Sequence, residues 1–330
     1  MKSIALGEHD TFVETIMKSP NHLLCALLLV ATSAYAQFPD KPIKLIVPYD
    51  PGVVDAVARG IAPGMSEYLK VPVIVENAAG AAGSVGAGRV VKAAPDGYTM
   101  LYGSTAVFVQ NPFFYKLPYD PVKEFAPVSY GVNTGLFLLV NKSLGVKTLD
   151  ELIAMAKANP GKLTYGSSGN ASSGNVAGEL FKKRAGLDIT HIPYKNSTVT
   201  LTDLLASRIS MFFYPYQGAQ QHIQAGNLIA LAYTGKQRLP GAAHIPTFAE
   251  SGFPGYDQTL WFSFFVPAGT PKDVIAKLNA AVHRGMKEES IKKYYDFVPM
   301  PSTPEELGET VRREIDTFRS MMKELNIKVE

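Results

Sequence analysis

Two groups of residues could carry chemistry. One is the serine-rich run of residues 167–173, Ser-Ser-Gly-Asn-Ala-Ser-Ser, and the other is a set of four histidines: His191, His222, His244 and His283. A serine beside a histidine could act as nucleophile and base in a hydrolase. No serine of the run lies in a G-x-S-x-G motif, and no two of these histidines are spaced as a metal pair. Neither catalysis nor a metal site is predicted, although a secreted serine hydrolase stays open because triad members can be distant in sequence.

The serine-rich run fits anion binding better. Ser167, Ser168 and Asn170 follow an extended segment, residues 163–166, and precede a helical one, residues 174–185. The first N–H groups of a helix have no partner within it, and with nearby hydroxyl and amide donors they can hold a carboxylate. Helix capping would need only one such residue. We therefore predict a carboxylate-binding loop here.

A second turn of this kind lies near the start of the chain. Residues 43–47 are apolar and rich in β-branched side chains, which predicts a buried strand. Pro48, Pro51 and Gly52 end it, and residues 53–65 then return to helical spacing. Strand, tight turn and helix are typical of a parallel α/β sheet, with an anion favoured at the helix start. We expect a small carboxylate to be held between this turn and the serine-rich loop.

The elements that must position these turns form two α/β lobes. Strands are predicted over 71–76 and 99–102, followed by an aromatic, loop-like stretch at 107–122. Residues 125–140 are extended but interrupted at Asn133-Thr134-Gly135, which predicts a crossing into a second lobe. Residues 163–233 alternate strands and helices as a second parallel sheet would. Residues 260–266 are the expected return, followed by helices at 267–286 and 305–325.

The predicted domains follow from these crossings. Domain 1 comprises residues 37–134 and 259–330, and domain 2 comprises residues 135–258. Two lobes joined by two crossing strands enclose a ligand cleft and can close on a ligand.

Two other classes of binding protein are disfavoured. The glycines of the stretch 77–91 stand at 80, 83, 86 and 88, which matches neither a dinucleotide fingerprint nor a phosphate loop. Close packing of a helix on a sheet explains these small residues more simply. Short basic runs such as Lys182-Lys183-Arg184 are scattered, as on solvated helix faces, so we expect no nucleic-acid partner.

The N-terminal region predicts export. An apolar run at 23–31 follows Lys18 and precedes Ala34-Tyr35-Ala36, which is typical of a signal peptide cleaved after Ala36. Residues 1–16 carry three acids and do not belong to that pattern, so we interpret them as an extension before Met17. The single cysteine, Cys25, leaves with the leader, and the mature chain then has no thiol. The full sequence has 46% apolar and 18% charged residues, which is typical of a folded globular protein. From the leader we expect it in the periplasm, as a monomer without cofactors.

Several segments, in this order and spacing, resemble the Bug-type solute receptors of tripartite tricarboxylate transporters. The resemblance runs from about residue 38 to the end of the chain. The matching segments are Phe38-Pro-Asp-Lys-Pro-Ile-Lys-Leu-Ile-Val-Pro-Tyr49, Pro51-Gly52 with Asp55 and Ala58-Arg59, Ala94-Pro-Asp-Gly-Tyr-Thr-Met-Leu101, Tyr165-Gly-Ser-Ser-Gly-Asn170, Ala177-Gly-Glu-Leu-Phe181, His191-Ile-Pro-Tyr-Lys195, Pro246-Thr-Phe-Ala-Glu250 and Pro267-Ala-Gly-Thr-Pro271.

The resemblance implies a type II periplasmic binding protein fold without enzyme activity. It also implies a small carboxylate ligand, usually a dicarboxylate, that is handed to the membrane permease subunits of a transporter. A receptor that presents its ligand to a signalling partner instead has the same sequence features. The site residues that the resemblance implies are Tyr49, Gly52 and Val53 in the first turn, Ser167, Ser168 and Asn170 in the serine-rich loop, and Ser104 and Thr105 at the end of the third strand. Asp50, in the same first turn, is a further candidate although it departs from the family pattern.

Three residues depart from the pattern of that family. Asp50 replaces a small residue or proline, Val53 replaces a glycine, and Asn196 replaces a glycine. A carboxylate at Asp50 about 6 Å from a ligand carboxylate would cost roughly 3 kcal/mol at an effective dielectric constant of 20. With Tyr214 as a further candidate contact, we hypothesise an aromatic or amino-bearing acid as the ligand.

Overall fold

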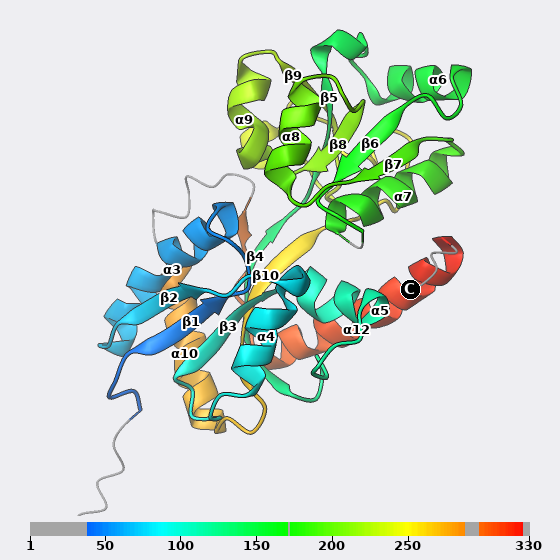
Figure 1. Ribbon diagram of the computed structural model, residues 1–330. Coiled ribbons are helices and arrows are strands. Elements are labelled where there is room, and N and C mark those ends of the chain that lie inside the picture. Colours follow the sequence, from blue (N-terminus) through cyan, green and yellow to red (C-terminus); the bar gives the residue numbers. More distant parts are fainter. Residues whose placement is uncertain (1–37, 171, 288–296, 326–330) are drawn as a thin grey trace, which may run out of the picture. The chain divides into compact units, whose positions relative to one another are not determined.

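The computed structural model describes residues 38–170, 172–287 and 297–325. The predicted leader and its cleavage site lie outside these residues. The described chain forms a six-stranded sheet in the order β11-β4-β10-β3-β1-β2 and a five-stranded sheet in the order β7-β6-β8-β5-β9 (Figure 1). No helix within the described ranges combines the length and the apolar character needed to cross a membrane. The fold class is the predicted α/β architecture of two lobes.

The first sheet is assembled from both ends of the described chain. Its strands are β1 (Ile43–Val47), β2 (Val73–Asn77), β3 (Thr99–Ser104), β4 (Phe125–Thr134), β10 (Leu260–Pro267) and β11 (Val298–Pro299). Strand β1 pairs in parallel with β2 and β3, whereas β10 is antiparallel to β3 and β4. The first lobe therefore has a mixed sheet, and the prediction of a parallel unit holds only for its opening strands.

Helices cover both faces of this sheet. They are α3 (Val53–Leu69), η1 (Ala81–Gly83), α4 (Ser84–Val91), the π-helix η2 (Ala106–Gln110), α5 (Asn111–Phe114), α10 (Lys272–Gly285) and α12 (Pro304–Leu325). Helices α3 and α10 lie on one face, and α4, α5 and α12 lie on the other (Figure 1). Helix α12 buries Leu307, Val311, Phe318 and Met322, which are spaced by four and seven residues, so the predicted apolar stripe packs in the core.

The second sheet consists of short strands, of which β5 is buried throughout. Its strands are β5 (Phe137–Asn141), β6 (Thr164–Ser167), β7 (Thr190–Pro193), β8 (Met211–Tyr214) and β9 (Leu228–Tyr233). Its helices are η3 (Lys142–Leu144), α6 (Leu149–Ala158), α7 (Ser173–Ala185), α8 (Ser197–Leu205), α9 (Tyr216–Gln224) and η4 (Pro240–Ala242). Successive residues of β5 alternate between two apolar clusters: Leu138 packs in the cluster of α6 and α7, and Phe137 packs in that of α8 and α9.

The sequence predicted a parallel second sheet, and this prediction is wrong for β5. Strand β6 is parallel to β7 and β8, but β5 runs antiparallel to both of its neighbours, β8 and β9. The chain enters β5 directly from β4 through Gly135 and Leu136, without an intervening helix.

The stretch that the sequence predicted as a loop at 107–122 is partly helical. Residues 106–110 form a π-helix that continues into α5. Asn111-Pro112 and two phenylalanines gave a turn-like composition, but Val107, Phe108 and Val109 are buried in the core beneath α12. Tertiary packing thus overrides weak local helix propensity here.

Candidate functional site

Loops from both sheets line a cleft of about 1050 Å³. Each loop follows the carboxyl end of a strand, where helix N-termini also point. From the first lobe the lining includes Pro48, Tyr49, Asp50, Val54, Ala79, Gly80, Ala81, Gly83, Ala106, Asn111, Phe114, Tyr115 and Phe262. From the second lobe it includes Ser168, Gly169, Asn170, Ser172, Ser173, Gly174, Asn175, Glu179, His191, Lys195, Asn196, Ser197 and Tyr214.

A polar chain of contacts fixes the first turn. Asp55, buried in the first turn of α3, accepts two hydrogen bonds of 3.0 Å from the Nε of Arg59. The Nη2 of Arg59 donates to the side-chain oxygen of Asn77 at 3.1 Å, and the amide of Asn77 donates to the carbonyl oxygen of Tyr49 at 2.9 Å. Strand β2 and helix α3 therefore hold the turn at Tyr49 from two sides.

The side chain of Tyr49 is anchored within the first lobe. Its hydroxyl shares a hydrogen bond with Ser104, and its ring meets Phe262 edge-on at 6.3 Å. Burial raises the pKa of Tyr49 to about 12, so the phenol stays protonated at neutral pH. Tyr49 therefore presents a fixed, uncharged aromatic wall to the cleft.

Part of the glycine-rich stretch packs closely against this turn. A Cβ placed on Gly86 of α4 would lie 2.8 Å from the Cβ of Pro48 and 2.9 Å from the carbonyl oxygen of Ala78. Only a glycine lets α4 approach the turn so closely. The packing explanation of the small residues therefore applies directly at Gly86.

The serine-rich loop is folded around one buried hydroxyl. Ser167 is fully buried and donates to the carbonyl oxygen of Gly169 at 2.8 Å, while the N–H of Gly169 donates back to Ser167 at 3.2 Å. Ser168 and Asn170 are exposed and line the cleft. Ser172 is the N-cap of α7, accepting from the N–H of Asn175 at 3.3 Å.

His191 holds the serine-rich loop through Ser167. Its Nε2 lies 2.7 Å from the Oγ of Ser167. Because that hydroxyl gives its one proton to Gly169, we assign Nε2 as the donor and Nδ1 as the unprotonated nitrogen, which lies 3.4 Å from the Nδ2 of Asn175. Burial lowers the pKa of His191, with an opposing effect of Glu179, so the ring is neutral at pH 7.

Five of the ten residues predicted for the site line the cleft, and five do not. Lining the cleft are Tyr49, Asp50, Ser168, Asn170 and Tyr214. Gly52, Val53, Ser104, Thr105 and Ser167 do not line it. Ser104 holds Tyr49, Thr105 accepts from the N–H of Trp261 at 2.8 Å, and Gly52 is the N-cap of α3. Direct ligand contact by any of the ten residues stays a prediction.

The sequence reasoning missed other residues of the lining, among them His191, Lys195, Asn196 and Tyr115. His191 had been considered as a possible base or metal ligand and, with Lys195, as part of a segment that resembles the family, but neither had been predicted for the binding site. Asn196 is the N-cap of α8, accepting from the N–H of Val199 at 3.0 Å. A polar residue just before a helical pattern was the available signal.

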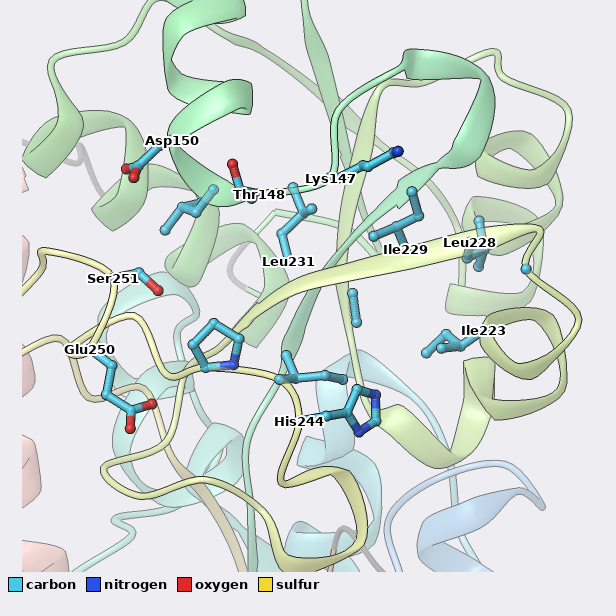
Figure 2. A pocket seen from close by; sticks show the side chains of 15 residues that line it. Lys147, Thr148, Asp150, Ile223, Leu228, Ile229, Leu231, His244, Glu250 and Ser251 are labelled. Atoms are coloured by element: carbon cyan, nitrogen blue, oxygen red, sulfur yellow. The ribbon is translucent and has the colours of Figure 1, made fainter.

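A second hollow, of about 640 Å³, lies against the edge strand β9 within the second lobe. Figure 2 shows that its labelled charged groups point apart, with Asp150 and Lys147 directed away from one another. Glu250, also at its rim, already accepts from Arg238 at 2.9 Å. The described residues contain no group of three histidine, cysteine or acidic side chains that could hold a metal ion. The interlobe cleft is therefore the candidate site.

Comparisons with known proteins agree on the relatives of this chain. A family model described as the tripartite tricarboxylate transporter family receptor matches residues 57–326. A solved Rhodopseudomonas palustris protein with adipate is 32% identical, with a TM-score of 0.82, covering 89% of this chain and 100% of its own.

Two further solved structures are similar. The periplasmic binding protein BugD is 27% identical, with a TM-score of 0.79, covering 89% of this chain and 100% of its own. MatC from R. palustris, with bound malate, is 29% identical, with a TM-score of 0.76, covering 86% of this chain and 99% of its own. The predicted Bug-type resemblance and the predicted periplasmic binding protein fold are therefore confirmed.

Proposed function

This chain belongs to the tripartite tricarboxylate transporter receptor family, and we propose that it is a periplasmic receptor that binds a small carboxylate and delivers it to the membrane subunits of a transporter. The observation that carries the proposal is the joint lining of one cleft by the first turn, at Tyr49 and Asp50, and by the serine-rich loop, at Ser168 and Asn170. The adipate and malate of two relatives support the ligand class.

The proposed ligand position follows from the donors in the cleft. The N-terminal residues of α7 and α8, which are 13 and 9 residues long, line the cleft at Ser173 and Ser197. Their unpaired N–H groups, with the hydroxyl of Ser168 and the amide of Asn170, offer a carboxylate several donors without requiring a paired cation. We place the ligand carboxylate against this wall, and the first turn closes over it from the other lobe.

The pair formed by Ser167 and His191 gives the only specific reason to consider a hydrolase. Their 2.7 Å separation is that of a nucleophile and its base. However, Ser167 has no exposed surface, and its proton is already committed to Gly169. We interpret the pair as a support for the loop, and the protein as a receptor rather than an enzyme. Ester turnover that disappears in Ser168→Ala or Ser167→Ala would contradict this.

A thermal-shift screen of small mono-, di- and tricarboxylates tests the proposed function, with calorimetry on each hit. A ligand that binds only the folded protein should raise its stability by ~2.7 kcal/mol at a hundredfold excess over the dissociation constant. Matched amides of the same acids are the control and should not stabilise it. No stabilisation by any carboxylate would overturn the proposal.

Delivery to a permease, rather than to a signalling partner, stays a proposal of its own. Uptake of the identified ligand by cells, lost when this gene is deleted and restored by its return, would support delivery. The division into domains at residues 134–135 and 258–259 and the monomeric state stay predictions, which limited proteolysis and light scattering would test.

A further inference from the structure

Some charged side chains of the cleft have hydrogen-bond or ion-pair partners within the protein, and others do not. Four side chains of the lining carry or can carry charge: Asp50, Glu179, His191 and Lys195. Glu179 accepts from the ammonium of Lys182 at 2.9 Å and from the hydroxyl of Tyr165 at 2.6 Å. His191 is hydrogen-bonded to Ser167. These two groups are thus satisfied within the second lobe.

Asp50 and Lys195 are the two that remain. Both are exposed, and neither side chain makes an ion pair or hydrogen bond with another residue in the parts of the chain that the structure describes. They stand on different lobes, because Asp50 follows β1 of the first sheet and Lys195 follows β7 of the second. The cleft therefore presents one unpaired negative charge on one wall and one unpaired positive charge on the other.

The surroundings of the two residues strengthen this polarity. Lys195 directly precedes Asn196, the N-cap of α8, so its ammonium adds to the partial positive charge of that helix end. Arg59, which is linked to the first turn through Asn77, is already engaged by Asp55 and Asn77. The second lobe is thus the wall that attracts a carboxylate, and Asp50 contributes an acid to the lining from the first lobe.

We propose that the ligand is a zwitterion, an aliphatic acid with an ammonium group, whose carboxylate binds the wall at Lys195 and whose ammonium group faces Asp50. This inference rests on the proposed function and narrows its ligand class. A dicarboxylate of the same length would place its second negative charge opposite Asp50, which disfavours it electrostatically. Charge complementarity of this kind acts on specificity more than on total affinity.

The test compares ligands that differ only at one end. Three matched pairs cover three lengths: succinate with 4-aminobutanoate, glutarate with 5-aminopentanoate, and adipate with 6-aminohexanoate. Calorimetry on the full protein should show the amino acid of at least one pair binding tighter than its dicarboxylate by about 10-fold or more. In Asp50→Asn this ratio should fall by about 10-fold, and in Asp50→Lys it should invert.

Two further variants separate the role of each charge. Lys195→Met should weaken both members of a pair by about 10-fold and leave their ratio unchanged, because it removes the contact to the shared carboxylate. Asp273→Asn, at an exposed acid of α10 that does not line the cleft, should change nothing.

The outcomes distinguish this inference from the function beneath it. Dicarboxylates that bind as tightly as their amino partners, or a ratio unaffected by Asp50→Asn, would overturn the zwitterion inference and leave the carboxylate receptor standing. Failure of every carboxylate in the panel and in the wider screen would overturn both.

Discussion

The side-chain amide of Asn77 donates a hydrogen bond of 2.9 Å to the carbonyl oxygen of Tyr49. Strand β2 thereby holds the turn that follows β1, at the point where the chain enters the cleft. The same side chain accepts from Arg59, which is bound to Asp55 in the first turn of α3. The geometry of the turn thus depends on residues outside the turn itself.

Asn77→Ala should loosen the first turn and weaken ligand binding. We expect a loss of about 1 kcal/mol in the free energy of unfolding, the usual net value of a hydrogen bond, and a roughly tenfold weaker affinity. Urea denaturation and calorimetry measure the two quantities. Asn159→Ala is the control, since it removes a 3.0 Å bond to Met155 at the end of α6 and should lower stability without changing affinity. Equal losses of affinity in both variants would speak against a role for the turn.

Gly86→Ala and Gly88→Ala should have opposite effects, although both lie in α4. The new Cβ at Gly86 would collide with Pro48, at a cost of roughly 1–3 kcal/mol in the free energy of unfolding. At Gly88 the nearest atom outside the helix is 3.9 Å away, so the alanine should stabilise the helix by about 0.5–1 kcal/mol. Urea denaturation of the two variants decides, and destabilisation of the same size in both would refute close packing at Pro48.

His191 should make stability depend on pH. Its pKa is lowered in the folded protein by burial, so the unfolded chain binds more protons than the folded one between the folded pKa and the ordinary value of about 6.5. The contribution of the neutral ring is therefore complete above pH ~6.5 and is lost as the pH falls through the folded pKa. His191→Gln should flatten this part of the profile of melting temperature against pH. His244→Gln, at an exposed histidine, should keep the wild-type profile, and an unchanged slope in His191→Gln would count against the assignment.

Trp261 is the only tryptophan of the chain and lies in β10, one of the two crossing strands. Its indole N–H donates to Glu314 of α12 at 2.6 Å. Because closure of two lobes is absorbed at the crossing strands, ligand addition should change the tryptophan emission spectrum in step with calorimetric saturation. Free N-acetyltryptophanamide with the same ligand is the control. Full calorimetric binding without any spectral change would argue that the lobes do not close.

The sequence predicted the parts of the fold that depend on local patterns. Residues 43–47 were predicted as a strand and are β1. The interruption predicted at Asn133-Thr134-Gly135 overlaps the gap between β4 and β5 only at Gly135, because β4 continues to Thr134. Thr148 directly precedes the helical pattern of α6 and caps it by accepting from the N–H of Glu151 at 3.2 Å. In each case a local feature of the sequence, such as an apolar run, a glycine or a capping residue, is sufficient to predict the structure at that place.

The parts that could not be predicted depend on distant contacts. The direction of β5 is set by its pairing with β8 and β9, about 70 and 90 residues away in sequence. The π-helix at 106–110 is stabilised by burial against α12, which the composition of that stretch does not reveal.

The same limit applied to the site. The serine-rich loop was found from its composition, but Ser167 turned inward to Gly169 and His191, a role that only the folded chain reveals. The hydroxyls of Ser104 and Thr105 are likewise engaged within the first lobe. Ser104 shares a hydrogen bond with the hydroxyl of Tyr49, and Thr105 accepts from the backbone N–H of Trp261. No sequence pattern around Lys195 indicated a role in binding. Its place on the cleft wall follows from the pairing of β7 with β6.

The most direct test is a crystal structure of the protein grown with a saturating concentration of the tightest ligand from the carboxylate screen. The account predicts electron density for that ligand in the interlobe cleft, with a carboxylate within hydrogen-bonding distance of Ser168 or Asn170 and the opposite end facing the turn at Tyr49 and Asp50. Density for the ligand at any other place, with this cleft holding only solvent, would contradict it.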